Sequence, residues 1–314
     1  MRIYDVLMLV SSMILVVGCA TDDDATDDDD STANSITTIS AGHFHTCNAR
    51  EGGNVECWGC GGGVENFGQC DAPTGVFSAV SAGAVHSCGV KADGSVECWG
   101  CGSEDYDDGQ CDTPVGVFSA VSAGSMHSCA LEDDGSIECW GCGNTSFDEG
   151  QCDPPVGAFS AVDTGTMHSC GMTADGILQC WGGNDYGQID VPSSVFDAFG
   201  NFSAGVSHTC GVKADDSVEC WGCGAGDLNV GQCDAPAGSY SAVSAGTRHT
   251  CGLKVDGSIE CWGCGNEMFD YGQCDPPAGS FTALSAGFDH NCGLANDGVV
   301  ECWGNNEEGQ CDVP

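Results

Sequence analysis

Short stretches in which apolar and small residues alternate recur along most of the chain. One such stretch, from Val76 to Ser81, reads VFSAVS, and two β-favouring runs follow it, from His86 to Lys91 and from Ser95 to Trp99. A Gly-Gln-Cys-Asp segment then ends the unit. Runs of this length between glycine-rich turns are typical of short strands. The pattern therefore predicts four short strands in each unit.

Close copies of this unit occur seven times, at a period of about 41 residues. A fixed period of this length is typical of propellers and solenoids. Although 314 residues would allow two domains, closed repeat folds run longer, so we expect a single repeat domain. One tryptophan marks each copy: Trp58, Trp99, Trp140, Trp181, Trp221, Trp262 and Trp303.

The loop between the second and third runs of a copy predicts a hairpin. Residues Lys91 to Ser95 read KADGS, and Gly94 can take the positive φ that a three-residue loop needs. Pairing Lys91 with Ser95 places Cys88 opposite Cys98, close enough for a disulfide. The same ten-residue spacing predicts seven hairpin disulfides: Cys47–Cys57, Cys88–Cys98, Cys129–Cys139, Cys170–Cys180, Cys210–Cys220, Cys251–Cys261 and Cys292–Cys302.

A second set of cysteines, also ten residues apart, follows the first. The fourth copy is shorter here and loses both positions together, to Gly183 and Ile189, so we expect the two cysteines to be bonded to each other elsewhere. The seventh copy has Asn305 in the first position, which leaves Cys311 as an odd thiol. Five outer disulfides are therefore predicted: Cys60–Cys70, Cys101–Cys111, Cys142–Cys152, Cys223–Cys233 and Cys264–Cys274.

Zinc or redox chemistry is the alternative interpretation of the Cys-Trp-Gly-Cys segments. A four-cysteine zinc site fails when it loses two ligands, yet the fourth copy keeps its other two cysteines. Nothing in the sequence resembles the βαβ setting of a redox Cys-x-x-Cys pair. Disulfides are therefore the better explanation of these cysteines.

The sequence SAGAVHSCGVKADGSVECWG, followed by Gly-Gln, resembles the repeats of the regulator-of-chromosome-condensation family, which includes the β-lactamase inhibitor protein II type. The resemblance spans Ile36 to Pro314. Its recurring marks are Ala-Gly-x-x-His, Asp-Gly, Trp-Gly and Gly-Gln, although Thr164 replaces the alanine once and Asp-Gly is absent at Gly52-Gly53 and Asp215-Asp216. The hairpin cysteines depart from the aliphatic or small residues that the family usually has there.

The resemblance implies an all-β fold, a seven-bladed β-propeller over residues 36–314, stapled here by disulfides. It also implies a propeller built to bind other proteins, whereas no catalytic activity transfers with a fold. We expect the N-terminal strand, which starts at Ile36, to complete the blade begun by the C-terminal strands and so close the ring.

The composition is strongly acidic. Lys and Arg number 6 against 47 Asp and Glu, which gives a formal charge of −41. Such a surface repels phosphate backbones and anionic lipid headgroups, so no nucleic-acid partner is expected. The favoured partners are cations, basic protein patches and neutral glycans. The 26 cysteines would indicate metal in a cytosolic protein but indicate disulfides in an exported one.

The first residues have the pattern of an export signal. Arg2 precedes an apolar run, Val6 to Val17, that is too short for a comfortable membrane span. Val16-Val17-Gly18-Cys19 resembles the bacterial lipoprotein box, which implies that residues 1–18 are removed and that Cys19 carries lipid. This predicts a bacterial cell-envelope protein, held by its lipid anchor alone at the outer membrane or cell surface. The alternative is an ordinary cleaved signal with an incidental cysteine.

Residues 19–35 predict an acidic disordered tether behind that anchor. Seven aspartates and no large apolar side chain lie between residues 20 and 35, so this segment cannot bury enough surface to fold. Its charge should extend it and hold the folded body away from an anionic membrane. Calcium binding by the aspartate run is the less favoured alternative.

Each copy also carries one histidine. Blades spaced around an axis do not bring three or four imidazoles within about 2.1 Å of one metal ion, so we expect structural hydrogen bonds and no metal site. By the same reasoning the tryptophans pack between blades and the Gly-Gln glutamines make turn hydrogen bonds. The histidines are His45, His86, His127, His168, His208, His249 and His290.

The segments just before Gly-Gln differ from copy to copy. A repeat fold places equivalent loops on one face, so these segments predict a binding rim rich in acids and aromatics. Merely solvated loops are one alternative, and a calcium site is another, although no known calcium-loop spacing is present. The expected anchors are Phe67, Tyr106, Phe147, Tyr186, Leu228, Met268 and Phe269, and the acids expected to set charge preference are Glu104, Asp105, Asp107, Asp108, Asp148 and Glu149.

These observations together favour a monomeric, non-enzymatic, cofactor-free surface protein that binds a protein or glycan through the rim. Inhibition of a secreted enzyme is a second hypothesis of the same kind. A glycan-cleaving propeller is the rival hypothesis. Against it, acids recur in every copy, so no single pair stands out as catalytic acid and base.

Overall fold

The computed structural model describes residues 35–61, 66–101, 107–143, 147–197, 200–224, 229–264 and 269–314. Every regular element in these ranges is a β-strand, and no helix there is long and apolar enough to cross a membrane. The predicted signal, all but the last residue of the tether and several rim residues lie outside the described ranges. The individual residues concerned are Cys19, Glu104, Asp105, Tyr106, Leu228 and Met268.

The described strands form seven sheets of three. The first four sheets are β1 (Ile36–Ala41), β2 (Thr46–Arg50), β3 (Val55–Trp58); β4 (Phe77–Ala82), β5 (Ser87–Lys91), β6 (Val96–Trp99); β7 (Phe118–Ala123), β8 (Ser128–Glu132), β9 (Ile137–Trp140); β10 (Phe159–Thr164), β11 (His168–Thr173), β12 (Leu178–Gly182). The last three are β13 (Phe202–Ala204), β14 (Thr209–Val212), β15 (Val218–Trp221); β16 (Tyr240–Ala245), β17 (Thr250–Lys254), β18 (Ile259–Trp262); β19 (Phe281–Ala286), β20 (His290–Ala295), β21 (Val300–Gly304).

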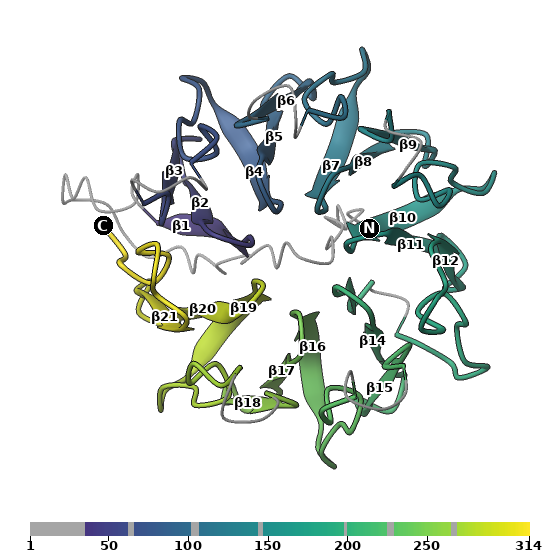
Figure 1. Cartoon of the computed structure of the whole chain (residues 1–314), viewed down its shortest axis with the longest axis vertical. Coiled ribbons are helices and arrows are strands. Elements are labelled where there is room, and N and C mark those ends of the chain that lie inside the picture. The colour runs from purple at the N-terminus through teal and green to yellow at the C-terminus, as the bar shows by residue number, and fades with distance from the viewer. Residues whose placement is uncertain are drawn as a thin grey trace, which may run out of the picture.

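The sheets stand around a central axis, as Figure 1 shows in the view down that axis. Within each sheet the strands follow one another antiparallel in sequence order, with the first strand nearest the axis and the third at the periphery. Apolar side chains of neighbouring sheets fill the space between them, for example Val90 with Phe118 and Val121. The prediction of an all-β, seven-bladed propeller is confirmed.

In most repeats an aromatic residue stands at or just before the start of the first strand. Its ring explains why one position of the second strand is glycine. The ring of Phe77 lies edge-on to Trp99, with ring centroids 6.0 Å apart, and occupies the space that a Cβ on Gly89 would need. In the sixth blade a tyrosine, Tyr240, takes the place of this phenylalanine. The repeat therefore sets a large aromatic side chain against a glycine, which has no side chain, so that the two strands can pack closely.

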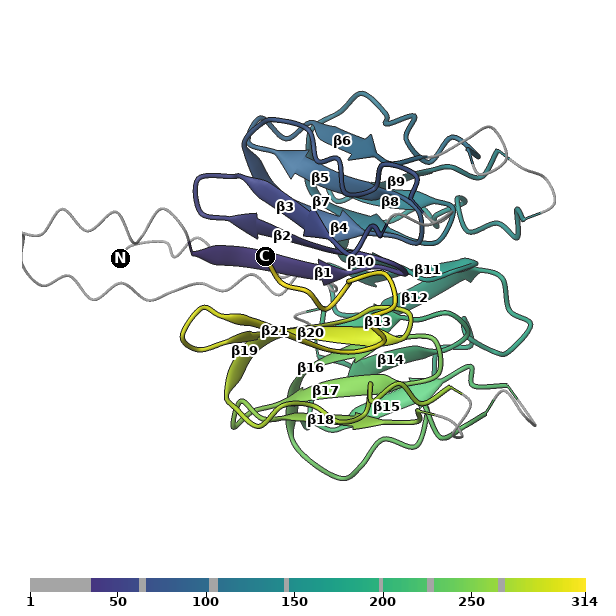
Figure 2. The ribbon, with the colours of Figure 1, turned by 60° about the vertical axis from the view of Figure 1, so that its left-hand side comes forward.

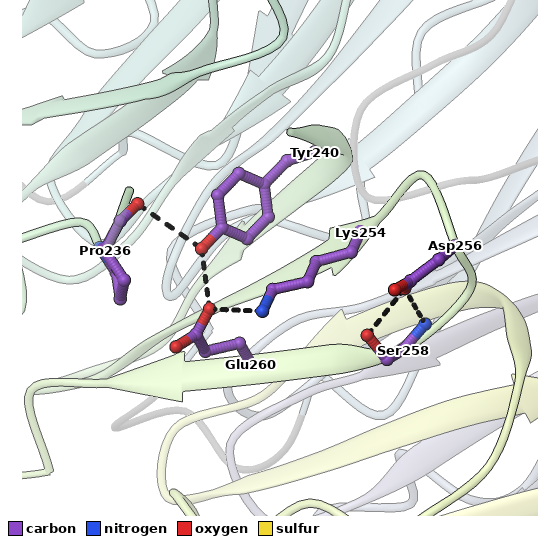
Figure 3. A network of polar contacts seen from close by, with 6 residues as sticks. All are labelled: Pro236, Tyr240, Lys254, Asp256, Ser258 and Glu260. Atoms are coloured by element: carbon purple, nitrogen blue, oxygen red, sulfur yellow. Dashed lines mark hydrogen bonds and ion pairs between the residues drawn. The ribbon is translucent and has the colours of Figure 1, made fainter. Parts of the chain in front are cut away.

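The hydroxyl of Tyr240 joins a polar network at the outer edge of the sixth blade (Figure 3). It donates a hydrogen bond to Glu260 Oε2 at 2.9 Å, and the same carboxylate forms an ion pair with Lys254 Nζ at 2.8 Å. Desolvation, together with Glu260, raises the pKa of the Tyr240 phenol well above its ordinary value. These contacts tie the third strand of this blade to the first and second.

The hairpin prediction is confirmed. Cys88 pairs with Cys98, the Lys91 amide donates to the Ser95 carbonyl at 2.8 Å, and Gly94 has a φ of 82°. All twelve cysteine pairs named above form disulfides in the structure, with Cα–Cα distances of 4.0–4.1 Å in the hairpin set and 5.9–6.2 Å in the outer set. The propeller is thus stapled by disulfides.

Cys311 is free and half-buried. Its Sγ donates to the Asn305 carbonyl at 3.4 Å, within the shortened loop that lacks the partner cysteine. Burial and the neighbouring Asp312 raise the pKa of the Cys311 thiol to about 11, which keeps it protonated and unreactive at neutral pH.

The prediction of four strands per repeat is wrong, because each described sheet has three. The Gly-Gln-Cys-Asp segment forms a tight turn, in which Gly68 has a φ of 88° and the Asp71 amide donates to the Gly68 carbonyl at 2.9 Å. The side chain of Gln69 accepts a hydrogen bond from the Phe67 amide at 2.7 Å. Such local side-chain bonds compete with strand pairing. The turn packs instead on the next blade, where Trp99 Nε1 donates to the Gln69 carbonyl at 2.9 Å.

The expected closure of the ring by a shared strand is also wrong. Every sheet is built from one continuous stretch, and β1 packs beside β19 and β20 without joining their sheet. The last turn makes the closing contact, because the Gln310 carbonyl accepts hydrogen bonds from Trp58 Nε1 at 3.0 Å and Thr46 Oγ1 at 3.1 Å. The seam between the last and first blades therefore uses the same bonds as the other interfaces, and no shared strand is needed.

Two sets of hydrogen bonds repeat at all seven interfaces. Each tryptophan Nε1 donates to the glutamine carbonyl of the preceding repeat at 2.8–3.0 Å. Near the axis, a first-strand amide donates to a side-chain oxygen of the preceding blade at 2.8–3.1 Å, such as Ala82 to Ser40 Oγ. Asp163 supplies this oxygen in the fourth blade, where the other blades have serine. The recurring polar residues thus bind blade to blade.

The propeller has two unlike faces, which the strands connect as seen from the side in Figure 2. The hairpin face carries the β-hairpin loops and the starts of the first strands. Ser35 lies on it, since its carbonyl accepts a hydrogen bond from Glu51 in the first hairpin loop at 2.7 Å. The variable face carries the Gly-x-x-His turns and the segments between Trp-Gly and Gly-Gln. These two parts touch, for example where the Asn305 amide donates to the Asp289 carbonyl at 2.9 Å.

Candidate functional site

The seven repeat histidines connect the blades and are not exposed on either face. Each is fully buried, and its Nε2 lies 2.7–2.9 Å from a side-chain oxygen of the next blade. The pairs are His45–Ser87, His86–Ser128, His127–Ser169, His168–Thr209, His208–Thr250, His249–Asn291 and His290–Thr46. The expectation of structural hydrogen bonding is met by this geometry.

The partner of His249 determines which ring nitrogen carries the proton. Asn291 Oδ1 can only accept, so His249 Nε2 donates to it at 2.8 Å, while Asn291 Nδ2 donates to the Gln273 carbonyl at 2.9 Å. Burial lowers the pKa of the seven rings to about 3 or about 4, because a protonated ring would carry a desolvated charge. They are neutral scaffold groups at physiological pH.

Four of the predicted rim anchors are described, and all four lie on the variable face. Phe147 is 52% exposed and Tyr186 is 40% exposed, whereas Phe67 and Phe269 are half-buried. Tyr271, 42% exposed, belongs to the same segment as Phe269 and was not among the expected anchors. It occupies the position just before Gly-Gln that Phe67 and Tyr186 occupy in other repeats, so alignment of the copies could have identified it.

The described rim acids have two roles. Asp107 and Asp148 cap their turns, because each Oδ1 accepts a hydrogen bond from an amide two residues later, at 3.0 Å. The next residues, Asp108 and Glu149, are held through their amides, which donate to the glutamine side chain of the turn at 2.7 Å. The backbone that displays these side chains is therefore fixed, which lowers the entropy lost when a ligand binds.

The residues between glycine and histidine in each Gly-x-x-His turn form a second, inner set on the variable face. The first residue of most pairs lines the mouth of the central channel, where a cavity of about 80 Å³ opens between the blades. Sequence reasoning passed over these pairs because the invariant glycine and histidine on either side dominate the pattern. In blade order they are His43-Phe44, Ala84-Val85, Ser125-Met126, Thr166-Met167, Val206-Ser207, Thr247-Arg248 and Phe288-Asp289.

Three aromatic rings stack at the channel mouth. The ring of His43 lies 3.7 Å from that of Phe44 and 3.4 Å from that of Phe288, centroid to centroid, with interplanar angles of 13° and 14°. Phe288 belongs to the last blade and His43 to the first, so the stack crosses the seam that closes the ring. Burial lowers the pKa of His43 to about 4, which leaves its ring neutral.

Arg248 belongs to the neighbouring sixth blade and follows Thr247, whose amide donates to the Phe288 carbonyl at 3.1 Å. Its guanidinium carbon sits 3.9 Å from the centroid of the Phe269 ring, a cation–π contact that joins the inner pair to the rim. Arg248 has no hydrogen bond or ion pair within the described part of the chain. Desolvation raises the pKa of the nearby Asp289, and the charge of Arg248 partly opposes this shift.

We call Arg248, Phe269, Phe288, Asp289, His43 and Phe44 the inner sector. It combines flat apolar surface with one cation and one desolvated carboxylate, a composition suited to binding. Across the ranges that the structure describes, no group of three or more His, Cys, Asp or Glu side chains is placed to hold a metal ion.

Comparison with known sequences identifies the repeats. The profile described as "Regulator of chromosome condensation (RCC1) repeat" matches residues 77–110, 118–151, 159–188, 240–273 and 281–310. Comparison with curated proteins by sequence gave no match.

Several solved structures share the fold. The ectodomain of the Physcomitrella patens receptor kinase CR4 is 23% identical with a TM-score of 0.66, over 86% of this chain and 74% of that one. The CRINKLY WD40 ectodomain of the Arabidopsis thaliana receptor kinase ACR4 is 23% identical with a TM-score of 0.64, over 86% and 97%. Prp20p from Saccharomyces cerevisiae is 15% identical with a TM-score of 0.63, over 84% of both chains.

Proposed function

The chain belongs to the regulator of chromosome condensation (RCC1) repeat family, and on this premise we propose that it is a non-enzymatic propeller that binds a protein. One fold hosts many functions, so family membership alone does not name the ligand. The proposal therefore rests on how this chain distributes its side chains.

The observation that carries the proposal is a division of roles within each repeat. The residues that recur in every copy, such as His127, Trp140 and Gln110, form the contacts between blades. The residues that differ between copies, such as Phe147 and Tyr186, gather exposed on the variable face. Variable side chains held by a rigid scaffold are where binding usually occurs.

Structures of the same fold support a protein as the ligand. The Prp20p structure is described together with its binding to Gsp1p and histones, and yeast RCC1 (Prp20) has been solved bound to Kap60. The charge of −41 further favours a partner whose contact surface is basic, because complementary charge speeds association and excludes acidic competitors. A glycan ligand has no such charge-based support.

We propose the bacterial cell envelope as the location, with a lipid on Cys19. The lipoprotein-like N-terminus and the disulfide-stapled body support it, since disulfides persist in oxidising compartments. Metabolic labelling with an alkyne fatty acid should modify the wild-type protein and leave Cys19→Ala unlabelled. Equal labelling of both forms would place the lipid elsewhere.

A glycan-cleaving activity receives less support from the site. Glycosidases need two carboxylates flanking the scissile bond. The described rim aspartates Asp107 and Asp148 are engaged as turn caps, and Glu260 of the recurring Glu-Cys-Trp segment is paired with Lys254. Inhibition of a secreted enzyme remains a special case of protein binding, recognised by loss of the captured enzyme's activity.

Affinity capture tests the proposal. The Cys19→Ser chain without its predicted signal would be used as bait with extracts of secreted and surface proteins. Capture should fail for a Phe147→Ser/Tyr186→Ser variant and survive in a Val117→Ser/Val156→Ser control, whose exposed valines precede the first strands near the hairpin face. If both variants captured the same proteins as the wild type, the variable face would not be the binding surface.

A further inference from the structure

Building on the protein-binding role proposed above, we propose that the inner sector is the energetic centre of recognition. Its partner is a loop of a basic protein that places an apolar side chain on the aromatic stack. A peptide amide of the same loop accepts a hydrogen bond from Arg248 and donates one to Asp289.

The unusual inner pairs are contiguous around the ring. In the second to fifth blades the Gly-x-x-His pairs are small or aliphatic, Ala-Val, Ser-Met, Thr-Met and Val-Ser. The aromatic and charged pairs fall in the sixth, seventh and first blades, which are neighbours because the ring closes there. The repeat architecture does not require this, since all seven interfaces keep their histidine, tryptophan and glutamine bonds whatever the pair.

The aromatic stack offers a rigid and partly exposed apolar surface. Phe44, His43 and Phe288 are half-buried, and His43 and Phe288 line the channel cavity. The stacked rings are held rigid by one another, with centroids 3.4–3.7 Å apart. Rigid aromatic surface with little conformational entropy to lose is typical of binding hot spots.

Arg248 and Asp289 form a polar pair whose side chains make no hydrogen bond or ion pair within the described ranges. Arg248 carries five N–H donors, and its guanidinium lies over the face of the Phe269 ring. Asp289 is half-buried and desolvated enough to raise its pKa, yet the charge of Arg248 still reaches it. An amide group satisfies both, because its oxygen accepts from a guanidinium and its N–H donates to a carboxylate. The pair therefore suits the backbone of an inserted loop.

Arg248 is a cation on a face of a strongly acidic protein. It is the single Lys or Arg of the variable face in the described ranges, whereas Arg50, Lys91, Lys213 and Lys254 lie next to hairpin loops. On an acidic face that attracts basic partners, a cation opposes binding by charge alone. If Arg248 contacts the partner directly, removing it should weaken binding. If it acted through its charge alone, removing it should strengthen binding.

This opposition gives a sharp test. The probe is a cyclic twelve-residue peptide with four lysines and one central phenylalanine, compared with its Phe→Ala counterpart by fluorescence anisotropy at 150 mM NaCl. Wild-type protein should bind the phenylalanine peptide about tenfold more tightly than the alanine peptide. This preference should disappear in Phe44→Ala and in the milder Phe44→Leu, and persist in Met126→Ala, the matched position of the third blade.

The Arg248→Ala variant reports the sign of the effect. It should weaken binding of the phenylalanine peptide several-fold, whereas Lys213→Ala near the hairpin face should leave it unchanged or slightly tighter. Tighter binding by Arg248→Ala would overturn the assigned role of Arg248.

Equal binding of both peptides by the wild type would overturn the hot spot and leave the protein-binding proposal standing. If neither peptide bound, the charge complementarity behind both proposals would be refuted. Thermal unfolding of each variant controls for misfolding.

Discussion

Each repeat histidine is fixed by its neighbours on both sides of the ring. In the first repeat, His45 Nε2 bonds to Ser87 of the next blade, and the other side of the ring lies against Gly42, where any Cβ would overlap the His45 ring and the Gly83 carbonyl. His45 Nδ1 has no hydrogen-bond partner in the described part of the chain. An added proton there would find no acceptor, so the packing depends on a neutral ring.

This dependence predicts a loss of stability in mild acid. The pKa of the seven rings is about 3 or about 4 in the folded chain and about 6.5 when unfolded. Between these values the unfolded chain binds more protons, so stability is fully present above pH 6.5 and falls as the pH drops towards 4. The thermal midpoint at 300 mM salt, measured from pH 7 to pH 4.5, should decrease steadily.

A single substitution separates this effect from the many carboxylates. His127→Gln should unfold with about one fewer proton taken up per molecule at pH 5, because one titrating ring is removed. Ser169→Ala, which removes the hydrogen-bond partner of His127 but keeps the ring, should retain most of the pH dependence. A midpoint that stayed level or rose between pH 6.5 and pH 5 would contradict the role assigned to the histidines.

At the scale of the elements, each blade is a three-stranded sheet with two kinds of disulfide. The hairpin bond joins buried Cys88 to Cys98, across β5 and β6, whereas the outer bond joins Cys101 to Cys111 beyond the last strand. The fourth blade has no outer bond, and its turn still places Gln188 against Trp221. The outer disulfides therefore support turns that can also form without them.

The two sets should consequently differ in what their removal costs. Replacing Cys101 and Cys111 by serine should lower the free energy of unfolding by at most about 3 kcal/mol, the chain-entropy estimate for a loop of this size. Replacing Cys88 and Cys98 should cost more, because the serine hydroxyl at position 88 would also be buried in the core. Denaturant titration without reductant measures both, and an equal loss from the two variants would argue against this distinction.

At the scale of the whole molecule, the ring closes through a turn. Deleting residues 305–314 removes the Gln310 carbonyl, which accepts hydrogen bonds from Trp58 and Thr46. The first blade should then lose its contact with the last turn. We expect a loss of several kcal/mol, since two buried donors lose their acceptor. Deleting only residues 313–314 should have little effect, because Val313 is exposed. Differential scanning calorimetry would distinguish the two, and similar midpoints would show that closure lies elsewhere.

The sequence predicted what is local and periodic. The Lys91–Ser95 hairpin and the pairing of Cys88 with Cys98 follow from spacing within a few residues. It mispredicted the Gly-Gln turn as a strand, because the bond from the Phe67 amide to Gln69 is invisible in a pattern of apolar positions. It missed the inner sector for a different reason. Most members of this sector stand between an invariant glycine and histidine that dominate the repeat pattern, and His43 and Phe288 are far apart in the sequence and meet only across the closed seam.

The position of Ser35 has a consequence for how an anchored molecule would meet its surroundings. The chain enters the propeller at the hairpin face, so a tether that ends in a lipid would join the propeller on that face. The variable face, with its aromatic and acidic side chains, would then point away from the membrane. A large protein partner could therefore reach the variable face without steric hindrance from the lipid bilayer.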